Sequence, residues 1–246
     1  MFDYQQYPNV EEMVISAPWS DVAVVASDPG NNLIKLGHEK LRWPANGQLV
    51  ITQQGKKLLV EVKNAVNNSQ INFDIKAPKN TKFTFNVGNS DETTINGIQG
   101  DIVMNAGNLR RMMVKNAGMV SIEGGNVQTL AVSKASDLKL KVGNVFDAII
   151  EDLEKDLDCE AGNGKLTVKF NETVIAAHKI NLSGGSFDFN LWAPKETIVK
   201  NSVDAPSFTT SVTSDFAEKP GAVEAGKGSV LIEGSIGVGS MSLKAK

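Results

Sequence analysis

Apolar and polar residues alternate in short runs along most of the 246-residue chain. A period of two is typical of a β-strand with one buried face, because successive side chains point to opposite sides of a sheet. Before residue 64 the pattern appears in five runs, namely MVIS, DVAVVAS, NLIKL, QLVITQQ and KLLVEVK, which are separated by turn residues such as Pro29-Gly30 and Gly55. An all-β fold is therefore predicted.

A glycine near the end of an alternating run recurs at nearly constant spacing. The segments TKFTFNVGN, GDIVMNAGN, GMVSIEGGN, SDLKLKVGN, KDLDCEAGN and HKINLSGGS share it, at Gly88, Gly107, Gly125, Gly143, Gly162 and Gly185. The steps between these glycines are 19, 18, 18, 19 and 23 residues. Such a period is too short for a strand-helix-strand crossover of about 30 residues, but it accommodates two or three short strands with their turns.

The simplest fold with this period is a single-stranded right-handed parallel β-helix, or β-solenoid, with coils of about 18–19 residues and β-rich capping ends. Successive coils would pair as parallel strands about 4.8 Å apart, and their crossovers would be right-handed, as nearly all are. We expect residues 71–202 to form the coils and residues 1–70 to form a β-rich opening section that covers the first coil. Residues 203–246 would hold a loop-rich segment and closing strands, all within one continuous domain.

One side of each alternating run is predicted to face the interior. The inward positions are Phe83, Phe85, Val87, Ile102, Met104, Ala106, Val120, Ile122, Gly124, Leu138, Leu140, Val142, Leu157, Cys159, Ala161, Ile180, Leu182 and Gly184. Outward positions of successive repeats would then be neighbours. They alternate in charge at Glu123, Lys141 and Glu160, and the acidic pair at residues 91–92 precedes the arginine pair at residues 110–111.

The asparagines that follow the repeated glycine are predicted to form a structural ladder at one corner of the coils. They are Asn89, Asn108, Asn126, Asn144 and Asn163. Asparagine tolerates a left-handed backbone at a turn, and its amide can hydrogen-bond to the equivalent amide along a stack. Turn chemistry already explains these residues, so we favour a structural role over a ligand platform.

The segments at both ends of the repeats carry the same turn. FDIKAPKNTKF and FNLWAPKETIV both contain Ala-Pro-Lys-x-Thr, and together they bracket the central coils. The following stretch at residues 201–228 is rich in small polar residues and contains two prolines, which predicts a mobile loop. The last run has glycines at Gly234, Gly237 and Gly239, which we interpret as strand corners because they lack the spacing of a phosphate-binding loop.

Composition restricts the functional classes. The chain has 25 basic and 28 acidic residues and a net charge of −3, so it lacks the basic excess of a nucleic-acid-binding protein. One cysteine allows no internal disulfide. No apolar run approaches the roughly 20 residues of a membrane-spanning helix, and residues 1–21 lack the pattern of a signal peptide. We expect no nucleic-acid partner, no direct membrane insertion and no signal peptide in this chain.

Residues that could perform catalysis are few. The histidines are His38 and His178, and no zinc-hydrolase or serine-hydrolase motif is present. Cys159 lies at an inward position, which predicts a small apolar core residue rather than a nucleophile. The acidic run EDLEKDLD at residues 151–158 could bind a metal, but it lacks the spacing of a calcium loop and is more typical of a solvated corner. No catalytic, cofactor or metal site is predicted.

The order of these segments resembles the bacterial putative-adhesin domain of unknown function, a right-handed β-helical family. The resemblance rests on GQLVITQQGKKLLVEV, FDIKAPKNTKFTF, INGIQGDIVMNAGN and GKGSVLIEGSIGVGSMSLK in that order, and it covers nearly the whole chain. It implies an exported or envelope-associated protein. It implies no catalytic residues.

The leading hypothesis is a non-enzymatic binding or scaffold protein, an adhesin that contacts a glycan or protein at a bacterial cell surface or envelope without a cofactor. One alternative is a polysaccharide lyase or hydrolase with a β-helical fold, in which Asp147, Glu151, Asp152 and Lys165 would converge on one groove. The other is a structural protein that assembles end to end into a homo-oligomer.

Overall fold

The structure is a computed structural model that describes residues 2–66, 69–172, 174, 176–194, 197–212 and 229–245. The described residues form fifteen β-strands and no helix, which confirms the all-β prediction. None of them lies in a helix with the length and apolarity needed to cross a membrane. The chain divides into two compact units, Met1–Gly125 and Asn126–Lys246, which we call the N-terminal unit and the C-terminal unit.

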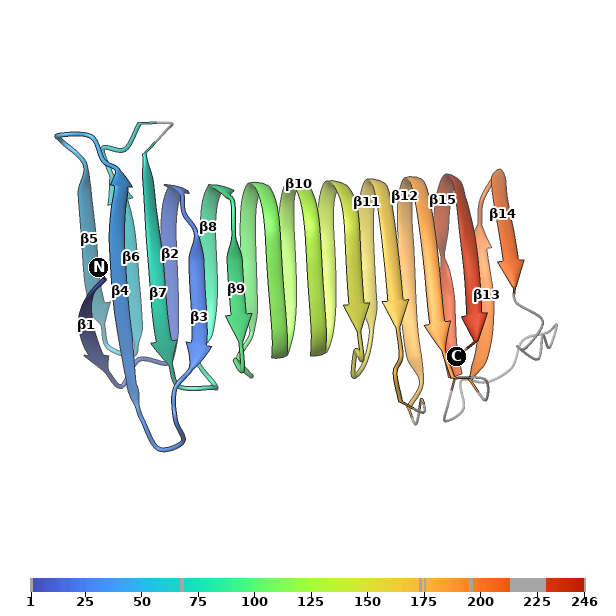
Figure 1. Ribbon diagram of the computed structural model, residues 1–246, viewed down its shortest axis with the longest axis horizontal. Helices are drawn as coiled ribbons and strands as arrows, with labels where there is room; N and C mark the ends of the chain where they lie inside the picture. Colours follow the sequence, from blue (N-terminus) through green and yellow to red (C-terminus); the bar gives the residue numbers. More distant parts are fainter. Residues whose placement is uncertain are drawn as a thin grey trace. The chain divides into compact units, whose positions relative to one another are not determined.

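The strands follow one another along the chain as labelled in Figure 1. The N-terminal unit contains β1 (Asp3–Pro8), β2 (Glu12–Trp19), β3 (Val22–Ala26), β4 (Leu33–Arg42), β5 (Gln48–Gln54), β6 (Lys57–Lys63), β7 (Gln70–Ala77), β8 (Lys82–Ser90), β9 (Thr93–Asn96) and the first part of β10 (Ile102–Glu151). The C-terminal unit contains the rest of β10, β11 (Leu157–Lys169), β12 (His178–Ala193), β13 (Ile198–Asp204), β14 (Ser207–Val212) and β15 (Ser229–Ala245).

Successive repeats pair in parallel in the N-terminal unit. Phe83 of β8 lies opposite Ile102 of β10, and Phe85 lies opposite Met104, so paired residues are one 19-residue repeat apart. β9 pairs with the next part of β10 in the same direction. The side chains of Phe83, Phe85, Ile102 and Met104 are all buried, as the alternation predicts. A shift of one residue would turn this whole apolar set toward solvent, which is why the register is strongly determined.

The C-terminal unit repeats this arrangement through β10, β11 and β12. Leu140 lies opposite Cys159, and Cys159 lies opposite Leu182. Cys159 has a relative exposure of 0% and its two neighbours are also buried. The predicted role of Cys159 as a core residue is therefore confirmed.

Charged residues on the outer side pair across neighbouring strands at the predicted positions. Lys141 Nζ lies 3.7 Å from Glu160 Oε2 in the C-terminal unit. Arg111 Nη1 lies 3.8 Å from Glu92 Oε1 in the N-terminal unit. These side chains are more than half exposed, so each pair contributes only about 0–1 kcal/mol.

The repeated glycines lie where the backbones of neighbouring repeats approach closely. A Cβ at Gly162 would lie 2.6 Å from the carbonyl oxygen of Gly143, and one at Gly185 would lie 2.6 Å from that of Gly162. Gly237 of β15 joins this column, because its Cβ would lie 2.8 Å from the carbonyl oxygen of Gly185. Real Cβ atoms are not found this close to a backbone oxygen, so steric contact explains the repeated glycine.

In the N-terminal unit, β2 and β3 each lie between two strands from later in the sequence. β2 pairs in parallel with β6 on one side and β8 on the other. β3 pairs in the same way with β7 and β9. Among the described strands no pairing joins β6 or β7 directly to β8 or β9. Figure 1 shows β2 and β3, in blue, between β7 and β8. The expected opening section is thus interleaved with the repeats.

The outer strands of the N-terminal unit are antiparallel. β5 pairs with β6, β4 pairs with β7, and β1 pairs with β4. The parallel repeat pattern ends at these strands, of which β5 and β6 are joined by a short turn at Gly55.

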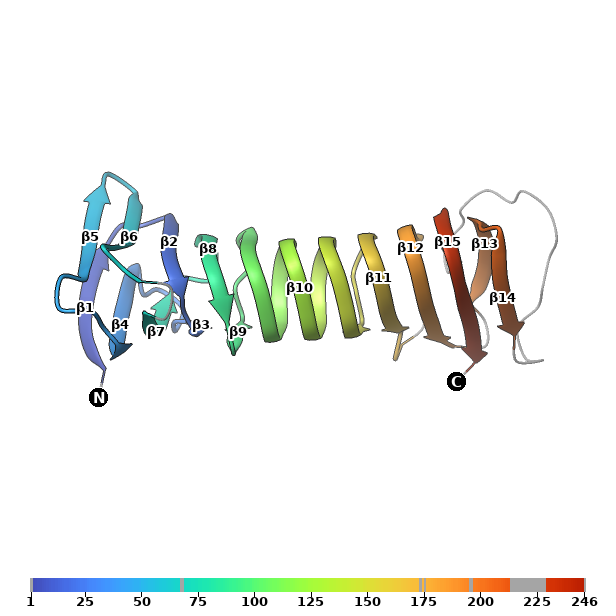
Figure 2. The ribbon, with the colours of Figure 1, turned by 90° about the horizontal axis from the view of Figure 1, so that it is seen from above.

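The C-terminal unit has the same kind of interleaving at the other end of the chain. β15 pairs in parallel with β12 on one side and with β13 and β14 on the other. Figures 1 and 2 both show β15, in red, between β12 and the strands β13 and β14. The prediction of a loop at residues 201–228 is wrong for its first part, because β13 and β14 extend to Val212. The remainder, residues 213–228, lies outside the described residues.

At each of the two Ala-Pro-Lys-x-Thr turns, the strands before and after the turn do not pair with each other, because a strand from elsewhere in the sequence lies between them. In the first, the backbone N–H of Thr81 donates to the carbonyl oxygen of Pro78 at 3.0 Å, and in the second Thr197 donates to Pro194 at 2.9 Å. The first turn leads from β7 to β8 past the layer of β2 and β3. The second leads from β12 to β13 past the layer of β15.

Candidate functional site

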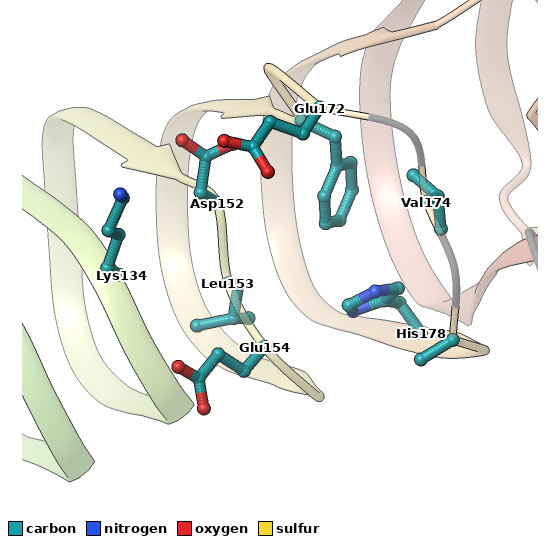
Figure 3. Close-up of a pocket in the computed structure, with 9 residues that line it drawn as sticks. Lys134, Asp152, Leu153, Glu154, Glu172, Val174 and His178 are labelled. Atoms are coloured by element: carbon teal, nitrogen blue, oxygen red, sulfur yellow. The ribbon is translucent and has the colours of Figure 1, made fainter.

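A pocket of about 360 Å³ opens on the C-terminal unit beside the segments that follow β10 and β11 (Figure 3). Its apolar side is formed by Leu153, Phe170, Val174 and Ala176, with His178. Its polar side carries Lys134, Asp152, Glu154 and Glu172. Apolar walls with a few polar groups are typical of small-ligand sites, and this combination suits a ligand with one apolar face and several hydroxyl or amine groups.

The pocket exists because one repeat is longer than the others. The step from Gly162 to Gly185 is 23 residues, and the additional residues follow Phe170 at the end of β11. Phe170 and Val174 are buried, whereas Asn171, Glu172, Ala176 and Ala177 are exposed, so the longer corner contributes two buried apolar side chains to the pocket. The unequal step was therefore a sequence signal for the pocket, but no site was predicted there.

His178 is the titratable residue closest to the apolar side of the pocket. Its Nδ1 lies 2.7 Å from the carbonyl oxygen of Lys155, and its ring lies 4.7 Å from that of Phe170, at an interplanar angle of 51°. Because a carbonyl oxygen can only accept, Nδ1 must carry the hydrogen. In the neutral ring Nε2 is then the acceptor. The other histidine, His38, lies in β4 of the N-terminal unit, opposite Phe73.

The acidic run at residues 151–158 is used mainly to hold the corners of neighbouring repeats. Asp152 accepts hydrogen bonds from the backbone N–H of Asn171 at 2.7 Å and from its side-chain amide at 3.0 Å. Asp156 accepts from the backbone N–H of Lys179 at 2.9 Å. Glu151 pairs with Lys169 at 3.1 Å. Among the described residues no group of three or more histidine, cysteine or acidic side chains is arranged to hold a metal ion.

The four residues considered for a polysaccharide enzyme are divided among different partners. Lys165 pairs with Asp147 at 3.7 Å, whereas Asp152 and Glu151 have the contacts given above. The pocket contains Asp152 but none of the other three.

The asparagine side chains are joined by hydrogen bonds within each unit. Asn108 Nδ2 donates to Asn89 Oδ1 at 2.9 Å in the N-terminal unit. In the C-terminal unit Asn144 Nδ2 donates to Asn126 Oδ1 at 2.8 Å, and Asn163 Nδ2 donates to Asn144 Oδ1 at 2.7 Å. Asn144 thus donates its N–H to one neighbouring repeat and accepts with its oxygen from the other.

The left-handed backbone expected at these asparagines occurs at a different corner. None of the five asparagines has a positive φ; instead Gly97, Asn116, Lys134 and Asp152 have φ values of 80°, 51°, 56° and 50°. These residues are 18 or 19 positions apart. The expectation was wrong because the Gly-Asn corner is extended and its glycine is required by close backbone contact. Two members of the left-handed column, Lys134 and Asp152, lie at the edge of the pocket.

Cys159 is chemically inert in the folded chain. Burial, with a smaller contribution from the neighbouring Asp158 carboxylate, raises the pKa of the Cys159 thiol to about 12. The thiolate, which is the nucleophilic form, is therefore strongly disfavoured at neutral pH.

Three solved structures align with almost the whole chain. A putative cell adhesion protein from Clostridium sporogenes shares 10% identity, with 100% of both chains covered and a TM-score of 0.29. A putative adhesin from Bacteroides fragilis shares 10% identity over 99% of this chain and 97% of the other, with a TM-score of 0.26. A putative adhesin from Parabacteroides merdae shares 11% identity over 98% and 95%, with a TM-score of 0.32.

These structural similarities are too low to support a functional argument. No protein-family model and no curated protein matches the sequence. The function has to be argued from the pairing, the exposed columns and the pocket of this chain.

Proposed function

We propose that the chain is a non-enzymatic right-handed β-solenoid that binds a glycan or protein partner at a bacterial cell surface or envelope. The observation that carries this proposal is the parallel, in-register pairing of repeats 18 or 19 residues apart in both units. A parallel crossover of this kind is right-handed in nearly all known cases, which supports the proposed hand. The resemblance in segment order to the bacterial adhesin domain supports the surface location.

In-register repeats place similar side chains at regular intervals on the outside. The asparagine row places side-chain amides on successive repeats at the strand spacing of about 4.8 Å. A polymeric partner that also presents a repeated group can make several such contacts at once, so that weak individual contacts give useful avidity. This is the reason we favour binding to an extended surface polymer or protein.

Cell location and binding together test the proposal. The producing bacterium would be fractionated and intact cells treated with protease, and we expect the chain to be removed from the cell exterior. Purified chain would then be tested for retention on cell-wall and host glycans. Protein confined to the cytosol would contradict the proposed role.

The pocket favours a second candidate, a polysaccharide hydrolase or lyase. The pocket contains His178, whose Nε2 is an acceptor in the neutral ring, together with Asp152, Glu154 and Glu172, and these are residue types that such enzymes use as acid and base. Incubation with acidic and neutral polysaccharides would distinguish the candidates. Product formation that is lost in Glu154→Gln or Glu172→Gln, but kept in the exposed control Glu160→Gln, would establish the enzyme and overturn the non-enzymatic proposal.

A further inference from the structure

β15 holds the last layers of the C-terminal unit together. It pairs along its whole length with β12, from Val230 opposite His178 to Ala245 opposite Ala193. On its other side it pairs with β13 and β14. Among the described strands, β13 and β14 have no other partner than β15. Removal of β15 would therefore leave a gap one strand layer wide between β12 and the pair β13–β14, which we call the β15 slot.

The β15 slot imposes a specific residue pattern on its occupant. The side chains of Val230, Ile232, Ile236, Met241 and Leu243 are all buried. A Cβ at Gly234 would collide with the carbonyl oxygen of Leu182, and one at Gly239 would collide with that of Phe187. Gly234 also has a φ of +142°, which disfavours any other residue. The slot thus selects an extended strand with apolar residues at alternate positions and glycine at the points of close contact.

Polar contacts add to this selection on the outer side. Ser240 Oγ donates to Asp188 Oδ1 at 2.7 Å, and Lys179 forms an ion pair with Glu233. Both join β15 to β12, and both depend on the register in which Glu233 lies opposite Asn181 and Ser240 lies opposite Asp188. A strand displaced by one residue would lose these contacts together with the apolar ones.

The N-terminal unit provides an independent instance of the same construction. There an Ala-Pro-Lys-x-Thr turn passes over a layer, and β2 and β3 from the beginning of the chain fill it. At both ends of the sequence, a terminal segment completes a layer that the chain left open at this turn. In the C-terminal case the filling segment follows its partners in the chain, so β12, β13 and β14 are synthesised before β15.

We propose that the β15 slot is a strand-acceptor site whose partner in trans is β15 of a second copy of this chain. The sixteen residues from 213 to 228 connect Val212 to β15 and can span at most about 55 Å when extended. This reach allows β15 to enter the slot of a neighbouring molecule, which is the exchange of an identical element that defines domain swapping. The inference does not depend on whether the chain binds a glycan or acts on one.

The site can be tested on the folded, full-length chain. A specific protease sequence is placed within residues 213–228, the protein is cut after folding, and the pieces are followed by size-exclusion chromatography. We expect the C-terminal piece to remain bound. A fluorescent peptide of residues 229–245 should then exchange into the cut protein, whereas the same peptide with Gly234→Val should enter at least tenfold less. Immediate loss of the piece, or equal entry of both peptides, would overturn the acceptor site.

The trans partner is tested with two differently tagged full-length chains, unfolded together and refolded over a range of concentrations. We expect a fraction of mixed dimers that increases with concentration and that becomes monomer-sized when residues 213–228 are cut. A chain that stays monomeric at every concentration would contradict exchange between copies. Dimers that keep their size after the cut would show association through another surface and would also overturn the proposal.

Discussion

Leu140 of β10 lies directly opposite Cys159 of β11, and both side chains are buried between neighbouring repeats. The next residue on each strand faces outward, where Lys141 pairs with Glu160. This alternation means that adjacent residues of one strand have very different environments.

The consequence for stability can be measured with two matched charge substitutions. Leu140→Asp places an unpaired charge in the core and is expected to lower the free energy of unfolding by at least about 3 kcal/mol. Lys141→Asp removes one exposed ion pair and should cost about 1 kcal/mol or less. Urea unfolding of both variants and the parent chain provides the comparison. Equal losses would show that the register described here is incorrect.

The raised pKa of Cys159 predicts a loss of stability at alkaline pH. The thiol titrates near its ordinary pKa of 9.0 in the unfolded chain and at about 12 in the folded chain. Its contribution is therefore fully present below pH 9 and declines between pH 9 and 12, by up to about 1.4 kcal/mol per pH unit. Unfolding of the parent chain and of Cys159→Ala across this range should show the steeper decline in the parent. Parallel curves would mean that the thiol is not buried.

The close approach of backbones at the repeated glycine predicts a steric cost for alanine. Gly162→Ala would place Cβ 2.6 Å from a backbone oxygen, and we expect a loss of about 3 kcal/mol. Gly55→Ala is the control, since its Cβ would meet no atom within 4 Å and only its φ of +59° disfavours alanine. That control should cost about 1 kcal/mol. A larger loss for Gly55→Ala, measured by thermal unfolding, would refute the steric explanation.

The asparagine row predicts a moderate loss when its centre is removed. Asn144→Ala removes the hydrogen bond to the amide oxygen of Asn126 and the one from the amide N–H of Asn163, at an expected cost of about 1–2 kcal/mol. Asn190→Ala on β12 removes an amide outside the row and should cost about 0.5 kcal/mol or less. Chemical denaturation measures both values. If Asn144→Ala is no worse than Asn190→Ala, the row does not stabilise the fold.

The candidate site was only partly accessible from the sequence. The two histidines and the acidic run were recognised as the available chemistry, and Asp152 and His178 do lie in the pocket. Phe170 and Val174 were missed, because their inward position depends on how the longer corner packs and not on strand alternation. Lys134 was missed because its place beside Asp152 depends on a left-handed corner, which its residue type does not predict.

The sequence by itself determined the period of the repeats, the outward charge pairs and the inward columns, except at Gly124 and Gly184, which were predicted to face inward and are exposed. It could do so because side chains alternate along a strand with a period of two, and because burial then requires apolar residues on one face of every repeat. Phe83, Leu140 and Cys159 could be placed in the interior on that basis alone.

Only the tertiary structure decided which layers are neighbours at the two ends of the chain. Parallel strands are joined by backbone N–H and C=O groups, which almost every residue has, so the pattern of a strand does not say which edge it will join. The sequences of β2 and β15 have the ordinary alternation of a strand. Their residues do not show that each strand lies between two strands from another part of the sequence. That position is determined by the gap that Pro78 and Pro194 leave at their turns, and by the close contacts that require Gly234 and Gly239 opposite β12.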